Sequence, residues 1–333
     1  MKYLNNKLRN YLTVMSSIPA EIPYPQEPKQ PLLLLVDVSG SMAPRITRLV
    51  SGLRILKEEI LKDDVARRRV EVAILAFGGG NDENGVRLVQ DFVPVERLDI
   101  DRISESLIPG GLTPMGHALL KAVEVVEGRK QQYKEQGINY YRPWIWLITD
   151  GYPTDIYTPT DELLILSADH VIIVDDEVRK MIQEQSSSSN ISSPTAYTYR
   201  DLVTVPVYLS DEVINRLRQR PRADITKYCS NDLYNTVMTR LKTGIDNKKF
   251  ILWPVVVGKP GELDLVLGFM VLRDCIMSKV DPTRPPVWLE DTEQKWSAMF
   301  QWLSTSIKLT STSRPGETQK LPDISGWAQI KVV

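Results

Sequence analysis

The sequence predicts an α/β protein built on a doubly wound, mostly parallel sheet, with an α+β lobe inserted into it. Residues 32–36, 70–77 and 144–148 are apolar or almost apolar runs of strand length. Such runs are typical of strands buried on both faces of a parallel sheet. Intervening segments carry apolar residues three and four positions apart, as expected for helices that cover the sheet.

The composition limits the possible functions. The 333 residues, 42% of them hydrophobic, can fill a sizeable core. A net charge of −1 argues against a general attraction to nucleic acid or to a membrane surface. Cys229 and Cys275 lack metal-ligand spacing and fit a reducing, cytoplasmic compartment. Because the chain has two histidines, His117 and His170, a His-rich zinc site is excluded.

Residues 1–30 are expected to form an N-terminal helix and a proline-rich strap. Leu4, Leu8 and Leu12 repeat every four residues, which predicts a short amphipathic helix over residues 1–15. Residues 19–31 are expected to pack on the domain surface as an extended connector, and docking of a partner is the second possibility. No apolar run reaches the roughly 18 residues that a membrane span needs.

The first predicted strand ends in oxygen-bearing side chains. Asp37, Ser39 and Ser41 alternate there, and Gly40 allows a tight turn between the two hydroxyls. Ligands bind at this end of the strands in open α/β sheets, and a carboxylate with two hydroxyls suits magnesium or manganese. These residue types also cap helices, so both interpretations stay open on these residues alone.

The next segments continue the alternation of helices and strands. Residues 46–61 are predicted to form an amphipathic helix, residues 70–77 and 86–93 strands joined by a turn, and residues 100–107 a short helix. The glycines at positions 78–80 do not form a phosphate loop, because no GKS or GKT sequence follows and they connect two strands.

Two further segments bring polar residues to the same edge of the sheet. Thr113 follows a glycine pair and precedes a helix that is predicted to start at Pro114, where a capping role is the simpler interpretation of the threonine. Asp150 ends an apolar strand, as Asp37 does. In a doubly wound sheet, Asp37, Thr113 and Asp150 would converge from three loops on one ion, which capping does not explain.

These residues resemble the metal-ion-dependent adhesion site (MIDAS) of von Willebrand factor A (vWA) domains, which have a Rossmann-like fold. The resemblance is carried by Asp37-x-Ser39-x-Ser41, Thr113 after the glycine pair, and Thr149-Asp150-Gly151. Neighbouring sequences are similar to the bacterial tellurite-resistance TerY family. They are Thr113-Pro114-Met115-Gly116, Tyr141-Arg142-Pro143-Trp144, residues 150–155 and residues 300–307.

The resemblance divides the chain into a vWA domain, residues 31–155 and 231–308, and an insertion, residues 156–230. The insertion contains apolar runs at 163–166, 170–174 and 203–209, with a serine-rich stretch at 186–194 that is expected to be a flexible loop. We expect a small α+β lobe or a folded arm that borders the metal site, and that covers it or binds the partner.

The remaining elements follow the insertion. Helices are predicted over residues 232–245, 263–276 and 292–307, and strands over 250–258 and 287–289. Pro254 predicts that the strand over 250–258 lies near a sheet edge or a bulge. Residues 309–333 are expected to be a polar tail, held back on the domain by Trp327.

The resemblance implies a metal-dependent protein-binding module and not an enzyme. The predicted ligands of Mg²⁺ or Mn²⁺ are Asp37, Ser39, Ser41, Thr113 and Asp150, with the aspartates often acting through water. An Asp or Glu carboxylate of a protein partner would complete the coordination. The TerY family implies an adaptor in a bacterial stress-response or defence complex, with a kinase or a phosphatase as a possible partner.

Two alternatives remain. A metal-dependent phosphoesterase would use Asp37 as a nucleophile, but no lysine or arginine clamp is evident and His117 is a doubtful base. In a scaffold or RNA-associated protein the metal site would be structural, although the near-neutral charge speaks against broad contact with nucleic acid.

Overall fold

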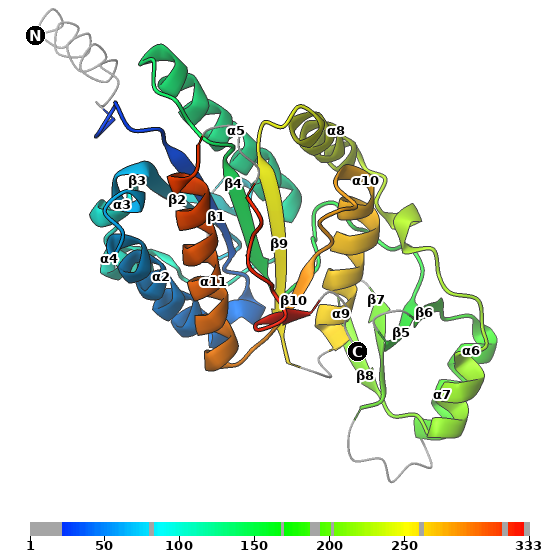
Figure 1. The fold of residues 1–333 in the computed structure, drawn as a ribbon. Coiled ribbons are helices and arrows are strands. Elements are labelled where there is room, and N and C mark those ends of the chain that lie inside the picture. Colours follow the sequence, from blue (N-terminus) through cyan, green and yellow to red (C-terminus); the bar gives the residue numbers. More distant parts are fainter. Residues whose placement is uncertain are drawn as a thin grey trace, which may run out of the picture.

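The described part of the computed structural model comprises residues 22–79, 83–167, 170–186, 194–200, 203–259, 263–314 and 319–329, and a seven-stranded sheet lies at its centre (Figure 1). The strand order is β11-β10-β9-β4-β1-β2-β3. The strands are β1 (Gln30–Asp37), β2 (Val70–Phe77), β3 (Val86–Pro94), β4 (Trp144–Thr149), β9 (Ile251–Gly258), β10 (Val287–Glu290) and β11 (Ala328–Gln329). The five inner strands pair in parallel, and β3 and β11 are antiparallel edge strands. The prediction of a doubly wound, mostly parallel sheet is confirmed.

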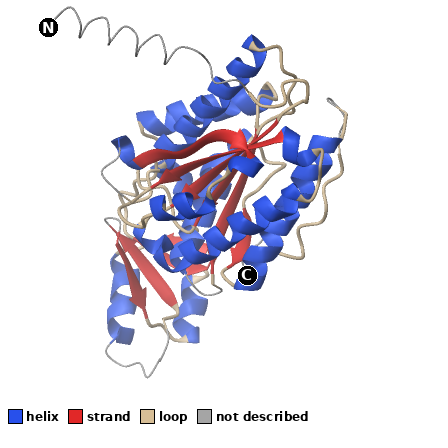
Figure 2. Cartoon of the chain, turned by 90° about the vertical axis from the view of Figure 1, so that its left-hand side faces the viewer, coloured by secondary structure: helices blue, strands red, loops and turns tan. Residues whose placement is uncertain are grey.

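Helices cover both faces of this sheet (Figures 1 and 2). Helices α2 (Ile46–Leu61) and α11 (Glu293–Thr312) pack on one face, which includes Leu32, Leu34 and Val36 of β1. The opposite face, with Leu33 and Leu35, packs on α5 (Met115–Glu135), α8 (Asp232–Asp246) and α9 (Leu263–Met270). Successive side chains of a strand point to opposite faces, so an unbroken apolar run is required here.

The predicted helices agree with the structure apart from their ends. The helix over residues 46–61 is confirmed at both ends, and α5 starts at Met115 because Pro114 is its N-cap. The remaining helical segments are η1 (Gly40–Arg45), α3 (Ala66–Arg69), η2 (Glu83–Gly85), η3 (Val95–Arg97), α4 (Ile100–Ser106), η5 (Val271–Met277) and α10 (Ser278–Val280). Among the helices described, none has the length and the apolar character needed to cross a bilayer.

The insertion forms a second sheet of four antiparallel strands in the order β6-β5-β7-β8. Its elements are β5 (Leu163–Ser167), β6 (His170–Ile173), α6 (Asp176–Ser186), β7 (Ala196–Arg200), β8 (Val203–Val207), α7 (Asp211–Leu217) and η4 (Ile225–Tyr228). Strand β7 was not expected. One face of the sheet packs on α6 and α7, whereas Leu163, Ile165 and Tyr199 on the other face belong to the main core.

Three predictions near the C-terminus are corrected. Strand β9 lies in the interior of the sheet, although Pro254 suggested an edge or a bulge. The pairing of β9 with β10 starts at Val255. At Pro254 that side of β9 therefore has no neighbouring strand, and the N–H group that proline lacks is not needed for a hydrogen bond there. Helix α11 continues to Thr312, beyond the predicted end at residue 307. Strand β10 is not the last strand, because β11 pairs with it and brings the buried Trp327 onto the domain.

The predicted helix over residues 1–15 lies outside the described residues. The same is true of residues 19–21 in the proline-rich segment and of residues 187–193 in the serine-rich stretch.

Candidate metal site

Asp37 is fixed at the carboxyl end of β1 by two hydrogen bonds. The Ser39 backbone N–H donates to its Oδ1 over 2.7 Å, and the Thr149 hydroxyl donates to its Oδ2 over 2.5 Å. Thr149 is the last residue of β4, which lies beside β1 in parallel register. Both side chains are fully buried. Asp37 is therefore held in one orientation by its own turn and by the neighbouring strand.

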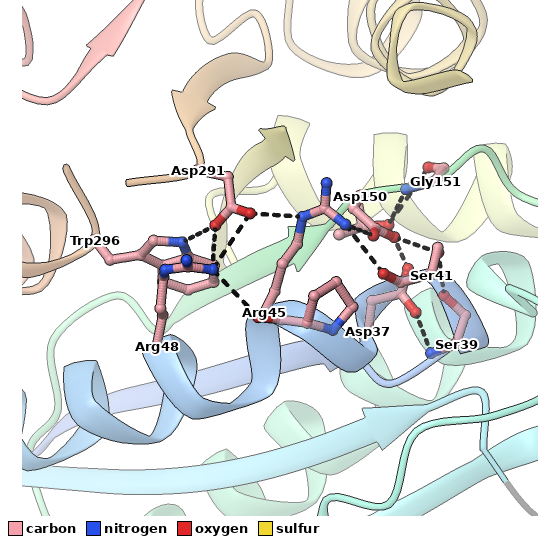
Figure 3. Close-up of polar contacts among 11 residues, drawn as sticks. Asp37, Ser39, Ser41, Arg45, Arg48, Asp150, Gly151, Asp291 and Trp296 are labelled. Atoms are coloured by element: carbon pink, nitrogen blue, oxygen red, sulfur yellow. Dashed lines mark hydrogen bonds and ion pairs between the residues drawn. The ribbon is translucent and has the colours of Figure 1, made fainter. Parts of the chain in front are cut away.

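Ser39, Ser41 and Asp150 continue this polar chain (Figure 3). The two serine hydroxyl oxygens are 3.2 Å apart, and the Ser41 hydroxyl donates to Asp150 Oδ1 over 2.7 Å. Ser39 is the N-cap of η1 but its side chain makes no capping hydrogen bond. Ser41 is exposed, whereas Ser39 and Asp150 are almost fully buried. The geometry thus favours a shared site over the capping interpretation of these residues.

Thr113 reaches the same place through a loop tied to the other two. Its backbone N–H donates to Thr154 Oγ1, and its carbonyl accepts from the Thr154 N–H. A Cβ added to Gly151 would lie 3.3 Å from Thr113 Oγ1, so the hydroxyl lies against the residue that follows Asp150. Gly40 N–H also donates to the Gly111 carbonyl. All five predicted residues therefore gather at one edge of the sheet.

The two carboxyl groups of the site influence each other. Burial, and after it the nearby charge of Asp150, raises the pKa of Asp37 to about 7, while the hydrogen bonds from Thr149 and Ser39 act in the opposite direction. A cation bound between two buried carboxylates would relieve their mutual repulsion, so the electrostatics of this site favour a cation.

Arg45 was missed by the sequence reasoning. Its guanidinium Nη1 donates to Asp150 Oδ2 over 2.8 Å and to the Ser41 carbonyl over 3.0 Å. The sequence showed no evident lysine or arginine clamp, whereas the structure places the Arg45 guanidinium beside Asp150. Arg45 comes four residues after Ser41, at the end of η1. The sequence could not indicate this contact, because the direction of the Arg45 side chain depends on the course of η1, which the sequence did not predict.

Two packing contacts position the loop that carries Asp150. A Cβ on Gly268 of α9 would lie 2.7 Å from the backbone carbonyl of Gly151, so only glycine allows this close approach. Tyr199 of the insertion packs edge-on against Tyr152, with 5.0 Å between the ring centroids. The insertion thus borders the loop of Asp150, as expected.

His117 lies in another polar group. Its Nδ1 is 2.9 Å from Asp155 Oδ2, and Asp155 also accepts the backbone N–H groups of Gly116 and His117. Asp155 therefore satisfies donors at the start of α5, and His117 is half-buried beside it.

The donor set fits a hard cation. Within the residues that the structure describes, no group of three or more His, Cys, Asp or Glu side chains is arranged to hold a metal ion. A cation at this edge would depend on the hydroxyls of Ser39, Ser41 and Thr113 as well as on the two carboxylates. Such oxygen ligands suit Mg²⁺ or Mn²⁺ and exclude a site for a soft metal.

No protein-family model and no curated protein matches the chain. Solved structures of low similarity include the pilus adhesin SpaC from Lactobacillus rhamnosus GG, with 12% identity, a TM-score of 0.48 and coverage of 84% of this chain and 31% of that chain. The vWF domain of the type V pili tip protein Mfa5 from Porphyromonas gingivalis has 15% identity, a TM-score of 0.44 and coverage of 88% and 99%. A variant of the PilB minor pilin from Streptococcus sanguinis has 14% identity, a TM-score of 0.45 and coverage of 90% and 65%. The chain thus spans about a third of the length of SpaC.

Proposed function

We propose that the chain is a vWA-type domain that binds a protein partner through a divalent cation, Mg²⁺ or Mn²⁺. The observation that carries the proposal is the convergence of three loops. Asp37, Ser39, Ser41 and Asp150 form a continuous polar chain, and Thr113 lies against Gly151. A cation held largely by neutral hydroxyls keeps enough positive charge to attract an external Asp or Glu carboxylate.

The contacts of Asp37 support binding over phosphoester hydrolysis. A carboxylate nucleophile needs an oxygen that can reach the substrate. Both oxygens of Asp37 accept hydrogen bonds from the protein, and the side chain is fully buried. Ser41 is an exposed residue, which leaves the outer side of the site open to a ligand that binds the ion.

The identity of the partner is proposed from the resemblance to the TerY family alone. On this basis the chain is a cytoplasmic adaptor in a bacterial stress-response or defence complex, and its partner is a kinase or a phosphatase that offers a carboxylate. Neither nucleic acid nor a membrane is part of this proposal.

Calorimetric titration of MgCl₂ and MnCl₂ into chelator-treated protein tests the metal site. We expect binding by the wild type, and a loss of about tenfold or more in affinity for Ser39→Ala and Thr113→Ala, because each loses a hydroxyl ligand. Thr236→Ala removes an exposed hydroxyl on α8 and is expected to bind like the wild type. Absence of binding by the wild type would contradict the proposal.

A glutamate with blocked backbone ends then serves as a model of the partner's carboxylate. We expect it to bind when Mg²⁺ is present and not when the metal is chelated. Equal binding under both conditions would show that the carboxylate does not use the metal.

A further inference from the structure

Arg45 connects two of the loops that form the proposed metal site. Its side chain is 7% exposed, and one nitrogen, Nη1, bridges Asp150 Oδ2 and the Ser41 carbonyl. The same aspartate accepts the Ser41 hydroxyl on its other oxygen. Asp150 is thus held from both sides, with one oxygen bound to the Ser41 hydroxyl and the other to a permanent positive charge.

A third strand end fixes the opposite side of the Arg45 guanidinium (Figure 3). Asp291 follows β10, and its Oδ2 lies 3.4 Å from Arg45 Nε. The Oδ1 of Asp291 accepts from Trp296 Nε1 over 2.9 Å and lies 3.3 Å from Arg48 Nη1. Because Asp291 is almost fully buried, this network holds Arg45 in place from the far side of the site.

The charges of this cluster have a consequence for the bound ion. It contains the carboxyl groups of Asp37, Asp150 and Asp291 and the guanidinium groups of Arg45 and Arg48. With all of these ionised, a divalent cation leaves one positive charge in excess. Without Arg45 the same cluster would be neutral. Arg45 therefore decides whether the metal-loaded site still attracts an anion.

We propose that Arg45 is a positioning residue that acts through Asp150 and serves as a fixed counter-charge. It weakens the binding of the cation, and so leaves the bound cation with enough positive charge to recruit a carboxylate. The inference rests on the proposed function and adds its electrostatic control.

Three variants test this role by changing the charge in both directions. Arg45→Gln removes the positive charge and is expected to bind Mg²⁺ about tenfold more tightly, and the metal-loaded variant is expected to bind blocked glutamate about tenfold more weakly. Asp291→Asn removes a negative charge and is expected to show the opposite changes. The double variant Arg45→Gln/Asp291→Asn restores the net charge and is expected to bind both ligands nearly as the wild type does.

Calorimetry with MgCl₂, and then with blocked glutamate at saturating Mg²⁺, measures both affinities. Arg45→Lys keeps the positive charge but loses the planar guanidinium. It is expected to bind Mg²⁺ and blocked glutamate with affinities in the wild-type ratio. A purely structural role would weaken both ligands in every variant and would overturn the inference. Equal affinities in all variants would also overturn the inference but would leave the proposed function intact. A wild type that does not bind Mg²⁺ would overturn both the inference and the proposed function. If Arg45→Gln does not fold, Asp291→Asn and Arg45→Lys still decide the question.

Discussion

Thr149 holds the carboxylate on which the candidate site depends. Its hydroxyl donates to Asp37 Oδ2 and also lies 3.2 Å from the Gly151 nitrogen, which donates to it. When a buried carboxylate loses a hydrogen-bond donor, water cannot replace that donor, and one of the carboxylate's hydrogen bonds is left unmade. Thr149 thus contributes to stability and to the orientation of Asp37, without being one of the predicted ligands.

Replacing Thr149 by Val is expected to lower the free energy of unfolding by about 1–3 kcal/mol, since it removes a hydrogen bond to a buried charged group while keeping the shape of the side chain. Urea unfolding in the presence of a chelator measures the change. Thr198→Val, at a half-buried position of strand β7, is the matched control. A Thr149 variant as stable as its control would show that the hydroxyl does not support Asp37.

The candidate ligands could be proposed from the sequence because each one lies at or just after the end of a recognisable apolar strand, or follows a glycine pair. Arg45 and Asp291 were not found. Their contacts join η1 to the end of β10, residues far apart in the sequence, and no spacing rule relates them. An arginine at the end of a short helix is usually a solvated residue, and only the fold shows that this one is buried.

Helices α2 and α11 pack closely on one face of the sheet, and Gly52 makes this possible. A Cβ added to Gly52 would lie 2.0 Å from the ring of Phe300, which is fully buried. The two helices therefore approach each other at a distance that excludes any side chain at this position.

Gly52→Ala is expected to destabilise the protein by about 1–3 kcal/mol, because the overpacked contact outweighs the better helix propensity of alanine. Gly128→Ala in α5 is the control, since nothing lies within 4 Å of an added Cβ there. It is expected to stabilise the protein by about 0.5–1 kcal/mol. Thermal unfolding distinguishes the two, and equal effects would contradict the packing argument.

Elements whose apolar residues repeat with a clear period were predicted with nearly correct ends. Elements that depend on pairing with neighbouring strands were not. Helix α2 has the predicted bounds because its apolar stripe is regular. Strand β7 was missed because Tyr197 and Thr198 gain their pairing from β5 and β8, not from an apolar run of their own. The place of β9 in the sheet depended in the same way on where β10 begins.

The insertion shares the main core of the molecule. Its ends are adjacent, because Thr158 N–H donates to the Tyr228 carbonyl. Nevertheless, Leu163, Ile165 and Tyr199 belong to the same apolar cluster as α9. Cutting the insertion out would leave the chain connected but would expose that part of the core.

Replacing residues 158–230 by a short linker is therefore expected to destabilise the remaining domain by about 5 kcal/mol or more, since several large side chains lose their cover. Thermal unfolding and binding of a hydrophobic dye measure the change. Leu217→Ala, in the outer core of the insertion, is the control and is expected to leave the central sheet intact. A shortened chain that unfolds at the wild-type temperature would show that the insertion is an independent lobe.

The sequence by itself determined the α/β class, the central strands and the five candidate ligands, because strand period and strand-end chemistry are local signals. The tertiary structure decided the rest. It decided that Arg45 and Asp291 meet at the site, that the insertion shares the core, and that Glu71 is buried in β2. Glu71 is accommodated there because Arg129 and Tyr133 of α5 donate hydrogen bonds to its Oε2. These features depend on contacts between residues distant in the sequence, and such contacts exist only once the sheet has assembled.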